Sequence, residues 1–170
     1  MNTKLIAMIV APFLMGAPSF APLQSAATAR SEKDEKETLM HATGPFDVKI
    51  TPQDDKSADP LLGRMALDKQ YHGDLEATGK GQMLTAGTTV KGSGAYVAIE
   101  KVEGTLKGRS GTFVLQHTGS MGGGNFLLNV TIVPDSGTGQ LIGISGAMKI
   151  IIASDGKHSY ELEYMLPAHN

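Results

Sequence analysis

The chain of 170 residues contains no cysteine and no tryptophan, and only 5% of its residues are aromatic. The lack of cysteine excludes disulfides, thiolate metal sites, iron–sulfur clusters and a cysteine nucleophile. A strong excess of one charge is also missing, because 15 basic side chains stand against 17 acidic ones. This balance argues against a nucleic-acid-binding protein held by charge. The hydrophobic content of 41% is ordinary for a globular protein, and the length suits one domain.

The N-terminal region has only a short apolar run, residues 5–15, which falls below the roughly 20 residues that a membrane-spanning helix needs. The basic residue Lys4 precedes this run, small residues follow it, and the first acidic residue is Glu32. That layout is typical of a secretory signal peptide. We therefore expect residues 1–29 to be an export signal that directs the protein to the bacterial periplasm or the medium and leaves no membrane span after removal. The candidate cleavage positions follow Ala21, Ala27 and Ala29.

Residues 30–42 carry dense charges of both signs, which predicts a solvated linker or a short exposed helix. From Thr43 to Asn170 the pattern changes to short runs in which polar and apolar residues alternate, separated by glycine-rich turns. Residues 64–78 are predicted to form one continuous strand, and residues 140–144 another. Glycines within the predicted strands, at positions 73, 104, 143 and 146, suit the bends of a small barrel.

The order of these runs predicts an all-β domain over residues 43–170. Because no crossover helix separates the runs, we expect antiparallel connections between neighbouring strands. Closing the sheet removes the exposed edges that an open sheet would present to other chains. The pattern therefore favours a small antiparallel barrel of about eight strands over a two-sheet sandwich.

Several segments carry a resemblance to a known family: residues 63–75 (GRMALDKQYHGDL), 92–100 (GSGAYVAIE), 108–113 (GRSGTF), 133–146 (VPDSGTGQLIGISG) and 158–164 (HSYELEY). Together they resemble the bacterial domain-of-unknown-function family DUF3224, over about residues 40–167. This resemblance implies a small antiparallel barrel similar to those of allene oxide cyclase and the dirigent proteins. Residues 136–139 (SGTG) are also similar to the Gly-Thr-Gly turn of those plant barrels. The family has no established activity, so the resemblance bears on the fold and leaves the function open.

The spacing of the polar residues does not match the patterns of a metal site or of a serine hydrolase. The histidines at 41, 72, 117, 158 and 169 show no His-x-x-x-His or two-histidine, one-carboxylate spacing. His72 and Asp74 are read as residues of a solvated strand face. No serine stands in a Gly-x-Ser-x-Gly elbow. We expect neither a metal nor a cofactor, and the sequence leaves open whether the protein is an enzyme.

A more informative feature is the presence of polar residues on faces that are otherwise apolar. By strand parity Lys69 and Tyr71 share a face with Leu67. His117 likewise follows Leu115, and Tyr164 follows Leu162. Glu100 cannot be assigned to a face, because both faces of its strand are nearly equally apolar. If these faces point inward, the barrel has a ligand pocket whose candidate residues are Lys69, Tyr71, His117, Tyr164 and Glu100.

Three interpretations of function follow from these patterns. The first is a binding protein that holds a small apolar or amphipathic ligand inside the barrel. The second is an isomerase or cyclase that shapes a flexible substrate while His117, Tyr71 or Glu100 moves a proton. The third is a structural protein that forms homo-oligomers through apolar residues of the barrel exterior, namely Val114, Leu127, Ile151 and Met165.

Overall fold

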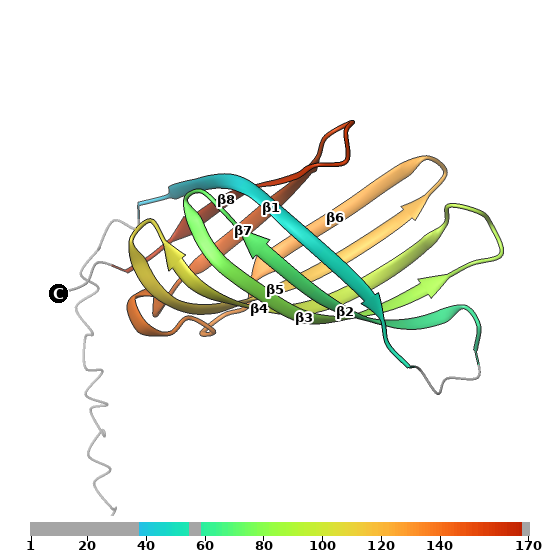
Figure 1. Ribbon diagram of the computed structural model, residues 1–170, viewed down its shortest axis with the longest axis horizontal. Helices are drawn as coiled ribbons and strands as arrows, with labels where there is room; N and C mark the ends of the chain where they lie inside the picture. Colours follow the sequence, from blue (N-terminus) through green and yellow to red (C-terminus); the bar gives the residue numbers. More distant parts are fainter. Residues whose placement is uncertain (1–37, 55–58, 168–170) are drawn as a thin grey trace, which may run out of the picture. The chain divides into compact units, whose positions relative to one another are not determined.

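The computed structural model describes residues 38–54 and 59–167, which form one antiparallel β-barrel (Figure 1). Each strand pairs with the next along the chain, and β8 pairs with β1, so the sheet closes. This arrangement confirms the predicted eight-stranded closed barrel. The strands are β1 (Met40–Pro52), β2 (Leu62–Tyr71), β3 (Leu75–Gly87), β4 (Gly94–Leu106), β5 (Arg109–Gly122), β6 (Asn125–Ile132), β7 (Ser145–Ile152) and β8 (His158–Met165).

The up-and-down topology gives the barrel two ends. The turns β2–β3, β4–β5 and β6–β7 lie at one end, which we call the packed end. The turns β1–β2, β3–β4, β5–β6 and β7–β8 lie at the other, which we call the open end (Figure 1). Within the described residues, no helix is long and apolar enough to cross a membrane.

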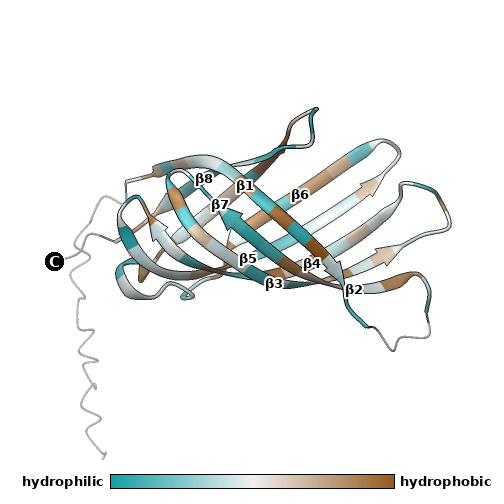
Figure 2. Cartoon of the chain, viewed as in Figure 1, coloured by the Kyte–Doolittle hydropathy of each residue, from teal (hydrophilic) through white to brown (hydrophobic). Residues whose placement is uncertain are grey.

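The alternation that predicted strands also decides which side chains enter the barrel. Along β1 the inward Phe46 and Val48 alternate with the outward Asp47 and Lys49, a banding visible in Figure 2. The first part of β1 pairs with β8, from Met40 to Phe46. The second part, from Phe46 to Pro52, pairs with β2. One long strand therefore closes the barrel across two neighbours.

The wall of the barrel is weakest between β6 and β7. These strands share a single paired position, Thr131 with Ala147. Toward the open end they separate, and their facing edges form no ladder in the described structure. We call this region the β6–β7 seam.

Two local predictions are wrong. Residues 64–78 are not one strand, because β2 ends at Tyr71 and β3 begins at Leu75. Gly73, with a φ of +92°, makes the turn between them. The alternating pattern does not reveal this turn. Tyr71 and Leu75 both face inward and are an even number of residues apart, so the alternation continues unchanged across the turn.

The second error concerns residues 140–144, which were expected to be a strand. Their first two residues instead belong to a short 3₁₀ helix, η1 (Gly139–Leu141), which begins at a glycine with a φ of +59°. This tight turn places Leu141 and Ile144 in the packed end, where both are buried. Burial of these two side chains, which a strand would have placed on a wall, explains the difference.

The N-terminal boundary can be described only in part. β1 begins at Met40, so residues 40–42 of the expected linker belong to the strand. The predicted signal peptide and the rest of the linker lie outside the described residues.

Candidate ligand-binding cavity

A cluster of four polar side chains lies inside the barrel. β2 contributes Lys69 and Tyr71, β4 contributes Glu100, and β5 contributes His117. Lys69 Nζ donates hydrogen bonds to Glu100 Oε2 at 2.7 Å and to the Tyr71 hydroxyl at 3.1 Å. The Tyr71 hydroxyl in turn donates to Glu100 Oε1 at 2.8 Å. Both carboxylate oxygens are therefore held by neighbouring side chains, and we call these four residues the Glu100 cluster.

The Glu100 cluster is withdrawn from solvent. Glu100 is 0% exposed, and the side chains of Lys69 and His117 are each only 3% exposed. Burial alone would raise the pKa of Glu100, but the neighbouring His117 and Lys69 outweigh it and lower the pKa. Burial raises the pKa of Tyr71 well above its ordinary value, and the adjacent Glu100 adds to this effect. Glu100 is thus a stable carboxylate, and Tyr71 is a neutral donor.

His117 completes the cluster with incomplete hydrogen bonding. Its Nε2 lies 3.0 Å from Glu100 Oε2, the oxygen that also accepts from Lys69. The contact is close, but it lacks the direction of a hydrogen bond, so Nε2 is a buried nitrogen without an aligned partner. Such a group is costly in a purely structural cluster. Among the described residues, Nε2 therefore interacts with Glu100 through proximity and charge and not through an aligned hydrogen bond.

Neighbouring residues make space for the buried carboxylate. Gly79 on β3 faces Glu100, and a Cβ at this position would overlap the carboxyl group and crowd the Tyr71 ring. The Phe46 ring lies below the ammonium group, with Lys69 Nζ 5.1 Å from its centroid. Glycine in the middle of a strand and an aromatic ring beside the cation together adapt the barrel interior to an ion pair.

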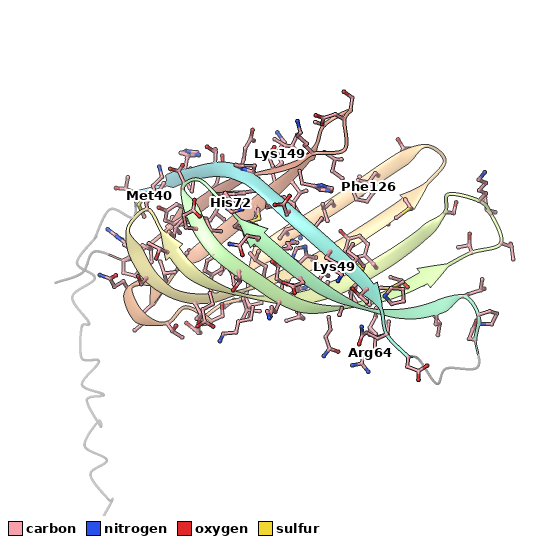
Figure 3. All side chains as sticks on the ribbon, viewed as in Figure 1. Met40, Lys49, Arg64, His72, Phe126 and Lys149 are labelled. Atoms are coloured by element: carbon pink, nitrogen blue, oxygen red, sulfur yellow. The ribbon has the colours of Figure 1, made fainter. Side chains whose placement is uncertain are left out.

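A cavity of about 320 Å³ extends from the Glu100 cluster to the open end. Lys69 and His117 form its polar floor, whereas its walls are mostly apolar and come from every strand. Phe126, labelled in Figure 3, stands at the rim on β6, far from His72 at the packed end. The apolar wall consists of Phe46, Val48, Ile50, Leu67, Met83, Tyr96, Met121, Phe126, Leu128, Ile150 and Ile152, with Thr85 and His158 as further polar members.

Comparison with known proteins identifies relatives of this chain. A family model described as "Protein of unknown function (DUF3224)" matches residues 42–164. The chain belongs to the DUF3224 family. The resemblance inferred from the sequence is thereby confirmed.

A solved structure agrees with this assignment. The chain is 49% identical to a DUF3224 protein of unknown function from Shewanella oneidensis MR-1, whose crystal structure aligns with a TM-score of 0.72. The match covers 77% of this chain and 100% of the other. No curated protein is significantly similar to the chain. The relatives therefore establish the family and the fold of this DUF3224 protein, and its function has to be argued from the cavity.

Four of the five residues proposed from the sequence come together, and one lies apart. Lys69, Tyr71, Glu100 and His117 form the cluster described above. Tyr164 also points inward and is buried, but it pairs with Met40 and Gly146 near the packed end. Strand parity thus predicted correctly that Tyr164 faces inward, but it did not predict how far along the barrel axis Tyr164 lies.

Sequence reasoning missed several residues of the site. Tyr96 lines the cavity from β4, and Gly119 makes room for its ring, since a Cβ there would collide with it. Burial raises the pKa of Tyr96, which therefore contributes a neutral hydroxyl. Interior glycines at 79 and 119 were the available signal, because a glycine within a strand often marks a close approach by another group.

Proposed function

We propose that this DUF3224 protein binds a small amphipathic molecule in the cavity at the open end. The observation that supports the proposal best is the contrast between apolar walls and a floor that offers Lys69 and His117. Ligand sites of proteins typically combine a largely apolar lining with a few polar groups that orient the ligand. An apolar body would fit against residues such as Leu128 and Met83, while a polar head would reach the floor.

The size of the cavity limits the ligand. A volume of about 320 Å³ corresponds to about ten non-hydrogen atoms if each takes about 30 Å³, the share of one water molecule in the liquid. Each buried CH₂ group contributes about 0.8 kcal/mol to transfer from water. A ligand of this size therefore gains most of its affinity from the walls and its orientation from the floor.

A second candidate function, proton-transfer catalysis, is favoured by one specific observation. His117 lies both at the cavity floor and 3.0 Å from the carboxylate of Glu100. A histidine held against a carboxylate is a common arrangement for a general acid or base. In that case the protein is an isomerase or cyclase whose cavity shapes an apolar substrate, and His117→Gln abolishes turnover while leaving binding of the apolar body intact.

Calorimetric titration with 1-octanol tests the binding proposal. Leu128 and Leu127 provide a matched pair, because Leu128 lines the cavity and Leu127 is 71% exposed on the outer face. We expect 1-octanol to bind the natural protein and the Leu127→Trp variant, and to bind Leu128→Trp at least tenfold more weakly. Circular dichroism and the melting temperature show whether each variant is folded. Absence of binding to the natural protein, or equal binding to both variants, would contradict the proposal.

A further inference from the structure

The donors and acceptors at the cavity floor determine which polar group of a ligand can bind there. Lys69 has three N–H donors, and the described structure uses two of them, on Glu100 and on Tyr71. The Tyr71 hydroxyl already donates to Glu100 Oε1. One ammonium N–H of Lys69 is therefore left for a ligand.

His117 supplies the second group. Its Nε2 faces a carboxylate oxygen, which only accepts, so chemistry assigns the proton of the neutral ring to Nε2. The other ring nitrogen, Nδ1, then carries a lone pair, on a ring that lines the cavity. Neutral His117 thus presents an acceptor beside the donor of Lys69, whereas protonated His117 presents a second donor.

A carboxyl group complements the floor in both states. With neutral His117, a protonated carboxyl accepts from Lys69 through its carbonyl oxygen and donates its O–H to Nδ1. With protonated His117, a carboxylate accepts from both residues. The two states contain the same atoms and the same number of protons. An alcohol matches only the first state, and an ester or ketone has no proton to donate.

We propose that the ligand is an apolar monocarboxylic acid whose carboxyl group binds between Lys69 and His117 and brings one proton into the cavity. This inference rests on the proposed binding function and specifies its ligand class. The proton is needed because Glu100 is already a buried anion that Lys69 neutralises. A second, uncompensated negative charge in the same dry site would be expensive.

Among the groups around the cavity floor, His117 is the one whose ring can share the proton of the bound acid. β2 presents Lys69 and Tyr71, β4 presents Glu100 and Tyr96, and β8 presents His158 at the rim. Lys69 is paired with Glu100, and Tyr71 and Tyr96 have raised pKa values, so neither phenol ionises near neutral pH. The cavity residues contributed by β3, β6 and β7 carry no titratable side chain.

The test compares octanoate, 1-octanol and methyl octanoate as calorimetric ligands of the full chain, from about pH 7 to about pH 9, where free carboxylic acids are ionised. Binding with one extra proton weakens the octanoate affinity by about tenfold for each pH unit. The affinities of 1-octanol and methyl octanoate stay constant. Titrations in buffers of different ionisation enthalpy should report uptake of about one proton for octanoate and none for 1-octanol.

Two histidine variants sharpen this test. His117→Gln should weaken octanoate binding at pH 7 by more than tenfold, and 1-octanol binding by less than threefold. His158→Gln, which alters the rim histidine, should retain the proton uptake. Binding of 1-octanol by each variant shows that its cavity is intact.

The outcomes separate the two proposals. Octanoate binding without proton uptake, or unchanged octanoate binding by His117→Gln, overturns the inferred arrangement. Binding of 1-octanol but not octanoate overturns the acid as the ligand class and leaves the proposed function standing. If none of the three ligands binds, the proposed function fails and this inference fails with it.

Discussion

The two ends of the barrel share one continuous wall but differ in what fills them. At the packed end, large inward side chains such as Phe113 and Tyr160 are fully buried. At the open end, inward apolar residues line a cavity, and those at the rim, such as Phe126, remain 51% exposed. The same alternating strands therefore produce a packed core in one half and a cavity in the other. The two ends therefore differ in the side chains that fill them and not in the strands that form the wall.

The packed end is closed by its loops. Segment 133–144 folds against β5, where Thr138 accepts from and donates to the backbone of Thr112, and it buries Leu141. The hydroxyl of Tyr160 accepts from the N–H of Leu75 at 2.8 Å and donates to the carbonyl of His72 at 3.1 Å. These contacts satisfy backbone groups of Thr112, Leu75 and His72 at this end.

The open end lacks such a closure among the described residues. The β6–β7 seam has one paired position, and the cavity residues Leu128 and Ile150 come from its two sides. Regions with few buried contacts and unpaired backbone edges open most easily. The sparse pairing of the seam therefore makes the open end the more adaptable end of the barrel, and the loops of the packed end make that end the more rigid one.

The largest expected loss of stability comes from removing a buried side chain at the packed end. Phe113→Ala should lower the free energy of unfolding by about 3–5 kcal/mol, because a buried phenyl ring is lost and a cavity remains. Its counterpart at the open end, Phe126→Ala, should cost less than about 1 kcal/mol, since that ring is already half exposed. Denaturant unfolding of both variants measures the difference. Equal losses would show that the two ends do not differ as described.

A similar loss is expected where the two ends meet. Glu100→Ala leaves Lys69 as a buried, unpaired cation and should cost about 3–5 kcal/mol. Glu100→Gln keeps the shape and should cost less. Because the native state lowers the pKa of Glu100, its charge contributes stability above the ordinary glutamate pKa, about 4.3, and loses it as the pH falls through the native value.

Unfolding at a series of acidic pH values checks this sign. The natural protein should lose stability more steeply than Glu100→Gln as the pH drops below about 4.3. Lys101 provides the control, because it forms an exposed ion pair with Glu103 on the outer face of β4. Lys101→Met should change the stability by less than about 1 kcal/mol. Parallel acid profiles for the natural protein and Glu100→Gln would contradict the buried ion pair.

A smaller effect is expected from Tyr160 at the packed end. Tyr160→Phe removes the acceptor of the Leu75 N–H and should cost about 1–3 kcal/mol. Burial, with Asp74 and Glu76 nearby, raises the pKa of Tyr160 to about 12, although the Leu75 N–H opposes this shift. The neutral phenol therefore stabilises the fold fully below the ordinary pKa, about 10, and this contribution disappears as the pH rises toward 12.

Tyrosinate absorbance during an alkaline titration provides the measurement. In the native protein little tyrosinate should form at pH 10, because the pKa values of all four tyrosines, at positions 71, 96, 160 and 164, are raised. In denaturant the four should titrate at the ordinary value. Native titration of Tyr160 at the ordinary value, identified by its absence in Tyr160→Phe, would show that the packed end admits water.

Parity along the strands was enough to predict which residues face inward, but not how far along the axis they lie. It placed Lys69, Tyr71 and His117 correctly on inner faces. It could not assign Glu100, because the neighbouring outward residues Val97 and Ile99 are apolar and exposed. Only the register of the paired strands determines the axial position, so Tyr164 could not be distinguished from the cluster residues.

The cavity itself could not be predicted from the sequence for a further reason. Its existence depends on the summed volume of inward side chains from all strands and on a loop that fills one end only. The chain between β6 and β7 was expected to return as a strand, whereas it turns and places Leu141 and Ile144 inside. No local sequence pattern indicates the total volume of the inward side chains. The difference between the two ends is therefore visible only in the closed barrel.

Nuclear Overhauser contacts between 1-octanol and the methyl groups of the protein show which half of the barrel interior holds the ligand. We expect contacts to Leu67 and Met83, which line the cavity, and none to Leu75 or Leu106, which pack at the other end. Contacts confined to the outward Leu127, or a ligand that reaches the packed end, would contradict the division of the interior into a filled half and a binding half.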